Sequence, residues 1–232
     1  YFMVWYPESS FQPYINYNDD QRTGFDIAVN YKKQWGDFGF QVGANYTYYT
    51  TKATKRDDTN FADKYQYRQG KPVDAIWGYE CLGFFKDDAD IQASPNQTKF
   101  APVIAPGDLK YKDQNGDKII DEKDQVELAK GGWYGAPSTL GVNLTLKYKN
   151  FTLFMLGVGG FGGHGVRDNS YWWIDEEDKY SAAVRDRWTP ETAETAKYPR
   201  LTTDSGKNNY QTSDFWIYST SRFDLAKVQL TY

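Results

Sequence analysis

The chain has 232 residues, with 27 Lys and Arg against 31 Asp and Glu, so its formal net charge at pH 7 is −4. This mild acidity gives no reason to expect a nucleic-acid partner. Aromatic residues make up 18% of the chain, and this content with low net charge excludes ordinary disorder. The low content of aliphatic residues excludes a standard helical domain. A mean hydropathy of −0.77 and the lack of any long apolar run exclude a membrane-spanning helix. An aromatic-rich β protein remains, either a sandwich or a barrel.

Alternation of apolar and polar residues predicts strands in several places along the chain. In chain order the alternating segments are Phe25–Tyr31, Phe38–Thr50, Leu140–Tyr148, Phe151–Phe161 and Ala226–Tyr232. The fourth segment is less regular than the others, because its glycines thin out both faces. Such strands occur in soluble sandwiches, with the polar face toward water, and in transmembrane barrels, with the apolar face toward lipid.

Three details favour the transmembrane barrel. Strands of about 10 residues match a tilted membrane crossing. Small and polar residues dominate the second face, which is typical of a lumen. Tyr46, Tyr48 and Tyr148 stand near strand ends, where an aromatic girdle is expected.

The connections between strands fall into two length classes. Gln34–Asp37 and Lys149-Asn150 are short turns, whereas Thr51–Pro137 and Gly162–Ser221 are long. In an up-and-down chain the short turns then fall on one side and the long loops on the other, as in outer-membrane barrels. A soluble domain would not need such long irregular connections. We therefore expect residues 1–232 to form part of one barrel domain, with two long extracellular loops, 51–137 and 162–221.

One segment has the spacing of a calcium-binding loop. Side-chain oxygens at positions 1, 3, 5, 9 and 12 come from Asp113, Asn115, Asp117, Asp121 and Asp124, and position 7 offers the backbone carbonyl of Ile119. Lys118 replaces the glycine usual at position 6, and Asp124 replaces the usual bidentate glutamate. The alternatives are a calcium (or magnesium) site and a solvated acidic turn.

The other motifs do not support catalysis. The glycines from Gly157 to Gly162 fit a dinucleotide-binding pattern, but no helix follows them. His164 is the single histidine and has no Cys or acidic neighbour in sequence. The acidic run 175–178 follows Trp172-Trp173, yet adjacent loop carboxylates do not set the separation that a glycosidase requires. These tryptophans suit a sugar platform or packing beneath a loop equally well. We expect no enzymatic activity.

Several motifs in register resemble SusC/RagA-type TonB-dependent outer-membrane transporters. They are Gly70–Pro72, Trp77–Phe85, Pro106–Asp124, Pro137 with Leu140–Leu144, Tyr148–Phe151, Arg187–Pro190 with Tyr198–Leu201, and Ser213–Trp216 leading to Leu225–Tyr232. The resemblance covers nearly the whole chain from about Thr23. The family's loop more often has Gly where Lys118 stands. This difference affects the prediction of metal binding, and it does not affect the resemblance to the family.

The resemblance implies a function that composition does not. Family members form a large barrel closed by an N-terminal plug domain in the outer membrane. They import glycan or peptide oligomers with energy passed through TonB, beneath a SusD-like surface lipoprotein lid. This chain would be an all-β, antiparallel segment of about six strands from the C-terminal part of that barrel, in contact with outer-membrane lipid. The chain begins at Tyr1 without a leader and ends at Tyr232 within an alternating run, as expected for part of a larger protein. The alternative is a secreted carbohydrate-binding β module with a structural calcium.

Overall fold

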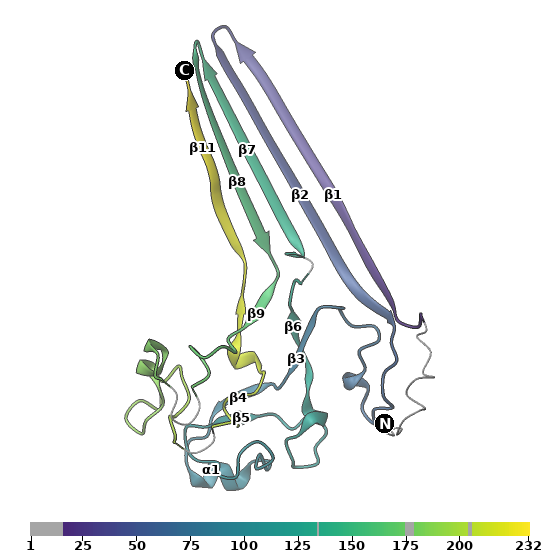
Figure 1. Cartoon of the computed structure of the whole chain (residues 1–232), viewed down its shortest axis with the longest axis vertical. Coiled ribbons are helices and arrows are strands. Elements are labelled where there is room, and N and C mark those ends of the chain that lie inside the picture. Colours follow the sequence, from purple (N-terminus) through teal and green to yellow (C-terminus); the bar gives the residue numbers. More distant parts are fainter. Residues whose placement is uncertain (1–15, 134, 175–178, 204–205) are drawn as a thin grey trace, which may run out of the picture.

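A long antiparallel sheet dominates the structure, a computed structural model that describes residues 16–133, 135–174, 179–203 and 206–232. Its strands are β1 (Asp19–Trp35), β2 (Phe38–Lys55), β7 (Ser138–Tyr148), β8 (Phe151–Phe161) and β11 (Arg222–Thr231), in the order β1-β2-β7-β8-β11 (Figure 1). Every neighbouring pair is antiparallel. The all-β antiparallel prediction is confirmed, with five strands in this sheet among the described residues instead of about six. The sheet does not close on itself.

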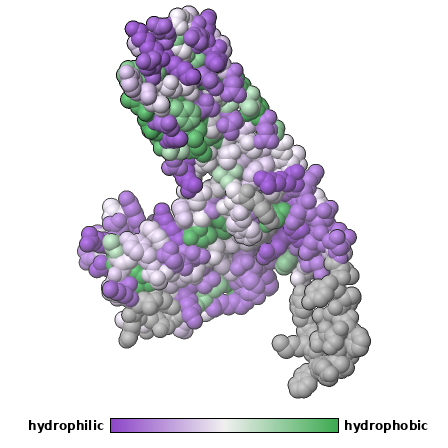
Figure 2. Space-filling model, turned by 45° about the horizontal axis from the view of Figure 1, so that its top comes forward, coloured by the Kyte–Doolittle hydropathy of each residue, from purple (hydrophilic) through white to green (hydrophobic). Residues whose placement is uncertain are grey.

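The two faces of this sheet differ in polarity. The register pairs Val42 with Leu144 and Leu144 with Met155, so aliphatic side chains line one face from strand to strand. This face has nothing over it among the described residues: Val29 is 61% exposed and Leu230 is 68% exposed. Figure 2 shows hydrophobic surface on the strands just beyond their hydrophilic tip. A sheet that presents an uncovered apolar face fits lipid contact and not a water-filled environment.

The opposite face carries small and polar residues. Asn45 pairs with Gly141, Gly43 pairs with Asn143, and Thr47 donates a 2.6 Å hydrogen bond to Asp26. Strand β8 departs from this pattern, because Phe154, Leu156 and Val158 share the polar face with their neighbours Thr145, Asn143 and Gly141. The face is otherwise of the kind that lines a lumen.

A β-bulge in β11 keeps its apolar residues on one face. Leu225 pairs with Gly157, while Lys227 pairs with Leu156, so two steps along β11 match one step along β8. The bulge shifts the alternation by one residue at Ala226. Phe223 and Leu225 before it, and Val228 after it, therefore lie on the same side of the sheet.

Aromatic side chains mark both ends of the apolar band. At the end with the short turns, Trp35 stacks on Phe38 with ring centroids 6.1 Å apart. At the other end, the rings of Phe25 and Tyr48 are 5.8 Å apart. From Phe38 to Tyr48 the strand rises about 33 Å at roughly 3.3 Å per residue. With a tilt of about 40° this spans about 25 Å, the height of the apolar band of a transmembrane barrel.

Two strands continue well past this band. Paired residues extend β1 back to Asp19 and β2 on to Lys55, so the predicted loop start at Thr51 is too early. The segment after Tyr49 pairs through its backbone but has few apolar residues, which is why alternation did not reveal it. None of the described helices is long and apolar enough to cross a membrane.

The two long connections are not irregular loops, because they fold together into a lobe. We use "the lobe" for the described residues of 56–137 and 162–221. Its small sheets pair β3 (Ala75–Gly78) with β6 (Val126–Lys130), β4 (Cys81–Phe84) with β5 (Leu109–Tyr111), and β9 (His164–Val166) with β10 (Ile217–Ser219). Its helices are α1 (Asp88–Ala93) and the short 3₁₀ turns η2 (Lys64–Gln66), η3 (Glu122–Asp124), η4 (Ala182–Asp186) and η5 (Asp214–Trp216). The lobe lies at the end of the sheet opposite the short turns (Figure 1).

Both connections contribute to one hydrophobic core in the lobe. The first supplies Tyr79, Leu109, Tyr111 and Ile120, and the second supplies Ile174, Val184, Tyr198 and Trp216. Leu109, Tyr111 and Ile120 are completely buried. The sequence divides these connections into two loops, but they pack as a single body.

Candidate functional site

The lobe holds the side chains that sequence reasoning singled out, and buried polar bonds fix its shape. Gln97 donates from its amide nitrogen to the carbonyl of Leu109 and to the side chain of Asn208, at 2.9 and 2.8 Å. The Tyr111 hydroxyl donates to the carbonyl of Asn208 at 2.7 Å. Asn208 lies 111 positions from Gln97 and 97 from Tyr111, so its two bonds tie the first connection to the second.

Motifs that stand far apart in the sequence meet in the lobe. Gly107 has a φ of +89°, and a Cβ added there would lie 2.4 Å from the ring of Trp188. The carbonyl of Gly107 accepts a 3.0 Å hydrogen bond from the backbone of Arg200. A left-handed backbone and this close approach both require glycine. Three motifs therefore pack against one another here: Pro106–Asp108, Arg187–Pro190 and Tyr198–Leu201.

The first half of the predicted metal loop is a tight acidic turn. Asp113 accepts backbone N–H bonds from Gly116 at 2.6 Å and Lys118 at 2.8 Å. Asn115 accepts one from Asp117 at 2.9 Å, and Asp117 accepts one from Ile119 at 2.9 Å. Each of these oxygens retains a further lone pair. The donor types and their turn suit a hard cation.

The second half of the loop is held differently. Asp124 is fully buried, and its two oxygens accept backbone N–H bonds from Gln114 and Asp121, both at 2.8 Å. Burial raises the pKa of this carboxyl. Asp121 forms a 2.9 Å ion pair with Lys99. These two carboxylates form the capping box of η3 and keep the loop closed.

The six predicted ligands thus fall into two groups. Asp113, Asn115, Asp117 and Ile119 belong to the acidic turn, and Asp121 and Asp124 belong to the capping box of η3. Among the residues that the structure describes, no three His, Cys, Asp or Glu side chains gather as a set that could hold a metal ion. Lys118 has a φ of +65°, the conformation for which glycine is usual at that position. The loop keeps its shape through its own hydrogen bonds, and calcium binding stays a prediction.

A cavity of about 260 Å³ opens beside the lobe core. It is lined by Arg167, Trp172, Ala183, Asp186, Lys197, Tyr198, Phe215 and Trp216. Trp172 is one of the two tryptophans singled out from the sequence, and it forms part of this wall. Both tryptophans pack against the hydrophobic core, and Trp173 does not line this cavity. Sequence reasoning missed Arg167, since a lone arginine after a glycine tract carries no recognisable motif.

A second cavity, of about 470 Å³, lies on the first connection. Its lining includes Phe61, Gln66, Arg68, Trp77 and Lys123, and the Arg68 guanidinium lies 5.4 Å from the centre of the Trp77 ring. Aromatic and polar groups thus face two cavities of the same lobe, and both are of the mixed composition that ligand pockets show.

The glycine tract and the histidine have structural roles. Gly157 and Gly159 belong to β8, and a Cβ on either would lie within 3 Å of the Phe223 ring. The Nδ1 of His164 lies 3.2 Å from the carbonyl oxygen of Lys130. Neither forms a nucleotide site. The acidic run 175–178 lies outside the described residues.

Known proteins resemble this chain in sequence and in fold. A TonB-dependent receptor, P26, from Formosa agariphila is 32% identical over 168 residues, which are 70% of this chain and 16% of that protein. The RagAB peptide transporter matches 97% of this chain and 24% of its own with 17% identity and a TM-score of 0.68. The RagAB peptide importer in its closed-closed state matches with 15% identity and a TM-score of 0.65. No family model matches.

In sequence the chain is similar to part of a TonB-dependent receptor, a class of outer-membrane protein. In fold it resembles the part of the RagAB transporter that comprises a stretch of barrel wall and the lobe joined to it. The chain spans about a sixth of the length of the receptor it matches and about a quarter of the matched transporter structures.

Proposed function

We propose that this chain forms part of the wall and outer lobe of a transporter that imports oligomers across the outer membrane. One observation carries the proposal: a sheet with an uncovered apolar face has short turns at one end and the lobe at the other. In outer-membrane barrels the short turns are periplasmic and the long connections are extracellular. The lobe then stands on the cell surface, where cargo arrives.

The activity would require no covalent chemistry from this chain. Cargo would bind at the outer mouth, a SusD-like lipoprotein would close over it, and TonB would draw on the plug to open a path. The similar proteins are a TonB-dependent receptor and a peptide transporter, RagAB. For this chain the cargo is a peptide or a glycan oligomer, because aromatic walls and polar groups in the lobe suit either class.

The uncovered apolar face also argues against a secreted carbohydrate-binding module. A soluble module would have to cover residues such as Ile27, which is 54% exposed. The full-length protein should therefore require detergent for purification as a folded species.

Sidedness is the first test. In full-length protein carrying Cys81→Ser, Ala193→Cys places a thiol on the exposed lobe, and Asn150→Cys places one on a short turn. A membrane-impermeant maleimide should label Ala193→Cys in intact cells. It should label Asn150→Cys only after the outer membrane has been permeabilised. Labelling of the turn in intact cells would reverse the proposed orientation.

Transport is the second test. Cells that lack the full-length protein should lose uptake of labelled peptide or labelled glycan oligomers, and a protonophore should abolish uptake in wild-type cells because TonB needs the proton gradient. The lost class of oligomer identifies the cargo. Unchanged uptake of both classes would contradict the proposed function, and a co-purifying surface lipoprotein would identify the lid.

A further inference from the structure

Arg167 lines the 260 Å³ cavity, and its guanidinium lies close to two aromatic rings. Its Cζ is 4.5 Å from the centre of the Trp172 ring and 5.5 Å from that of Tyr218. Arg167 itself is partly buried. Arg167 lines the cavity, and within the described parts of the chain no hydrogen bond or salt bridge occupies its side chain.

Other lysines and arginines near the lobe core differ in this respect. Lys110 pairs with Asp90 at 2.7 Å, and Arg200 pairs with Asp108 at the same distance. Arg167 forms no such ion pair with any described residue, although Asp186 lines the same cavity. Lys197 adds a second cation, so the charged side chains among the described lining residues, Arg167, Asp186 and Lys197, sum to a positive charge.

The walls around Arg167 are fixed by hydrogen bonds. The backbone N–H of Arg167 donates to the carbonyl of Trp216 at 2.9 Å. The Tyr198 hydroxyl donates to the carbonyl of Trp172 at 2.7 Å, and the Trp216 indole donates to Asn209 at 2.8 Å. A site held in this way loses little conformational entropy when a ligand enters.

A planar guanidinium suits a planar anion. Its N–H groups form a fork that matches the two oxygens of a carboxylate, and stacking on aromatic rings leaves that fork free at its edge. The remaining wall is apolar, with Ala183, Phe215 and Trp216 offering contact for a ring or a short aliphatic body. We propose that this cavity binds a carboxylate carried on such a body, with Arg167 forming a bidentate pair and Lys197 adding charge.

The carboxylate could come from a peptide or from an acidic sugar. These are the two cargo classes of the proposed function, and the assignment of the ligand rests on that function. The chemistry of recognition is the same for both. Matched neutral compounds therefore test the site, and the two sources are compared in parallel.

The experiment uses the full-length transporter in detergent and isothermal titration calorimetry. The probes are a tripeptide with a free C-terminal carboxylate and its C-terminal amide, and a uronic-acid disaccharide with the corresponding neutral disaccharide. At least one carboxylate probe should bind at least tenfold more tightly than its neutral counterpart, as expected for hydrogen bonds to a charged group. The source that binds identifies the class of ligand.

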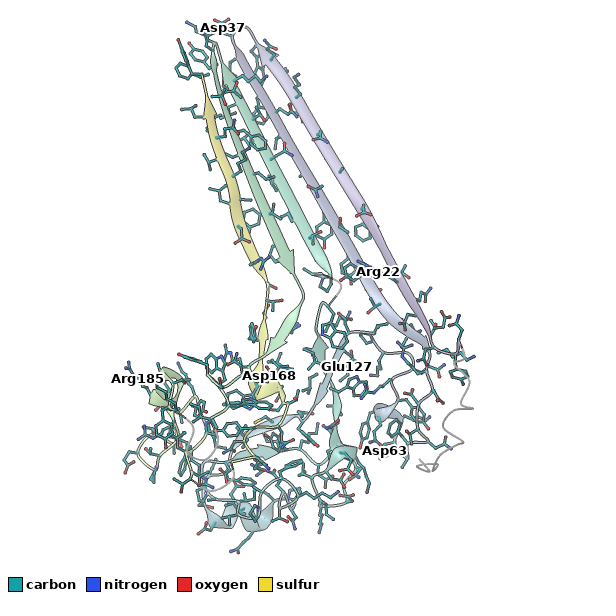
Figure 3. All side chains as sticks on the ribbon, viewed as in Figure 1. Arg22, Asp37, Asp63, Glu127, Asp168 and Arg185 are labelled. Atoms are coloured by element: carbon teal, nitrogen blue, oxygen red, sulfur yellow. The ribbon has the colours of Figure 1, made fainter. Side chains whose placement is uncertain are left out.

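Variants then assign the binding to Arg167. Arg167→Met keeps an apolar stem over Trp172 and should weaken binding at least tenfold, while Arg185→Gln should bind as the wild type does. Arg185 is exposed on η4 of the same lobe and does not line the cavity (Figure 3). If Arg167→Met fails to fold, Arg167→Lys retains the charge without the fork and should weaken binding several-fold.

Three results would overturn the proposal: no binding of either carboxylate probe up to about 10 mM, equal binding of the neutral compounds, or unchanged binding in the Arg167 variants. The uptake assay separates this from the proposed function. Wild-type uptake with no carboxylate binding removes only the cavity assignment. Carboxylate binding by a protein whose deletion leaves uptake unchanged removes only the transport proposal.

Discussion

Arg200 and Asp108 join the two long connections of the chain through a bidentate ion pair. The Nε of Arg200 donates to Oδ1 of Asp108 at 2.7 Å, and an Nη donates to Oδ2 at 3.1 Å. Asp108 is only 2% exposed and also accepts a bond from the side chain of Asn209. Both side chains that bond to the carboxylate come from the second connection, while Ala105 of the first donates its backbone N–H at 2.8 Å.

Removing the arginine should loosen the lobe. Arg200→Gln leaves the Asp108 charge buried with only neutral donors, which should cost about 3–5 kcal/mol of lobe stability. Faster hydrogen exchange in β4 and β5 measures the loss, since β5 directly follows Asp108. Arg187→Gln, an exposed arginine on the same connection, is the matched control and should change exchange little. Equal exchange in the two variants would show that the pair does not hold the lobe.

The two faces of the sheet predict opposite tolerance to charge. Leu144 lies on the apolar face near the middle of β7, and Thr145 follows it on the polar face. Leu144→Arg should destabilise the folded barrel by about 2–4 kcal/mol, because the charge must enter the hydrocarbon region. Thr145→Arg should be nearly neutral. Urea unfolding in lipid vesicles measures the stability of the two variants, and heat-dependent gel mobility reports the folded fraction. A larger loss of stability for Thr145→Arg than for Leu144→Arg would reverse the assignment of the faces.

The ion pair between Asp90 and Lys110 predicts an acid-sensitive contribution to lobe stability. The hydrogen bond from Lys110 lowers the pKa of the Asp90 carboxyl from its ordinary value. A depressed pKa in the folded state stabilises above the unfolded pKa, and this stability is lost as the pH falls through the folded value. Asp90→Asn should cost about 0.5–1 kcal/mol at neutral pH and nothing below the folded pKa.

Thermal melting of the lobe between pH 2 and pH 7, followed by tryptophan fluorescence, measures this dependence. Asp88→Asn removes the same charge from an exposed position of α1 and serves as the control. A difference between wild type and Asp90→Asn that persisted unchanged to the lowest pH would rule out this contribution.

The acidic loop gives a prediction about calcium. Millimolar calcium should raise the melting temperature of the lobe, and Asp113→Asn should remove that increase. Lys118→Gly should stabilise the loop by about 0.5 kcal/mol without metal, because glycine adopts the observed positive φ with less strain. It should also enlarge the calcium effect by removing a cation. A melting temperature that does not respond to calcium in the wild type would exclude the metal site.

Much of the wall could be predicted from alternation, and little of the lobe could. Apolar residues such as Val42 and Leu144 recur at every second position because one face meets lipid, so the sequence records them plainly. The lobe core instead draws single residues such as Tyr79 and Trp216 from distant segments with no shared period. Its fold depends on long-range contacts, which local patterns do not encode.

The candidate site shows the same contrast. The acidic loop was recognisable because its oxygens follow a fixed spacing within twelve residues. Arg167 was not, since its importance arises from two rings, Trp172 and Tyr218, that come from opposite ends of the second connection. A side chain defined by its surroundings becomes visible only after the chain has folded.

The shared core of the lobe has a mechanical consequence. Four segments link the lobe to the wall, leading from β2, into β7, from β8 and into β11. Because the two connections interlock through Trp216 and Tyr111, neither can swing open while the other stays still. A force applied at any point of the lobe is therefore transmitted to all four attachments at once, so the lobe tilts as a rigid cap instead of opening like separate flaps.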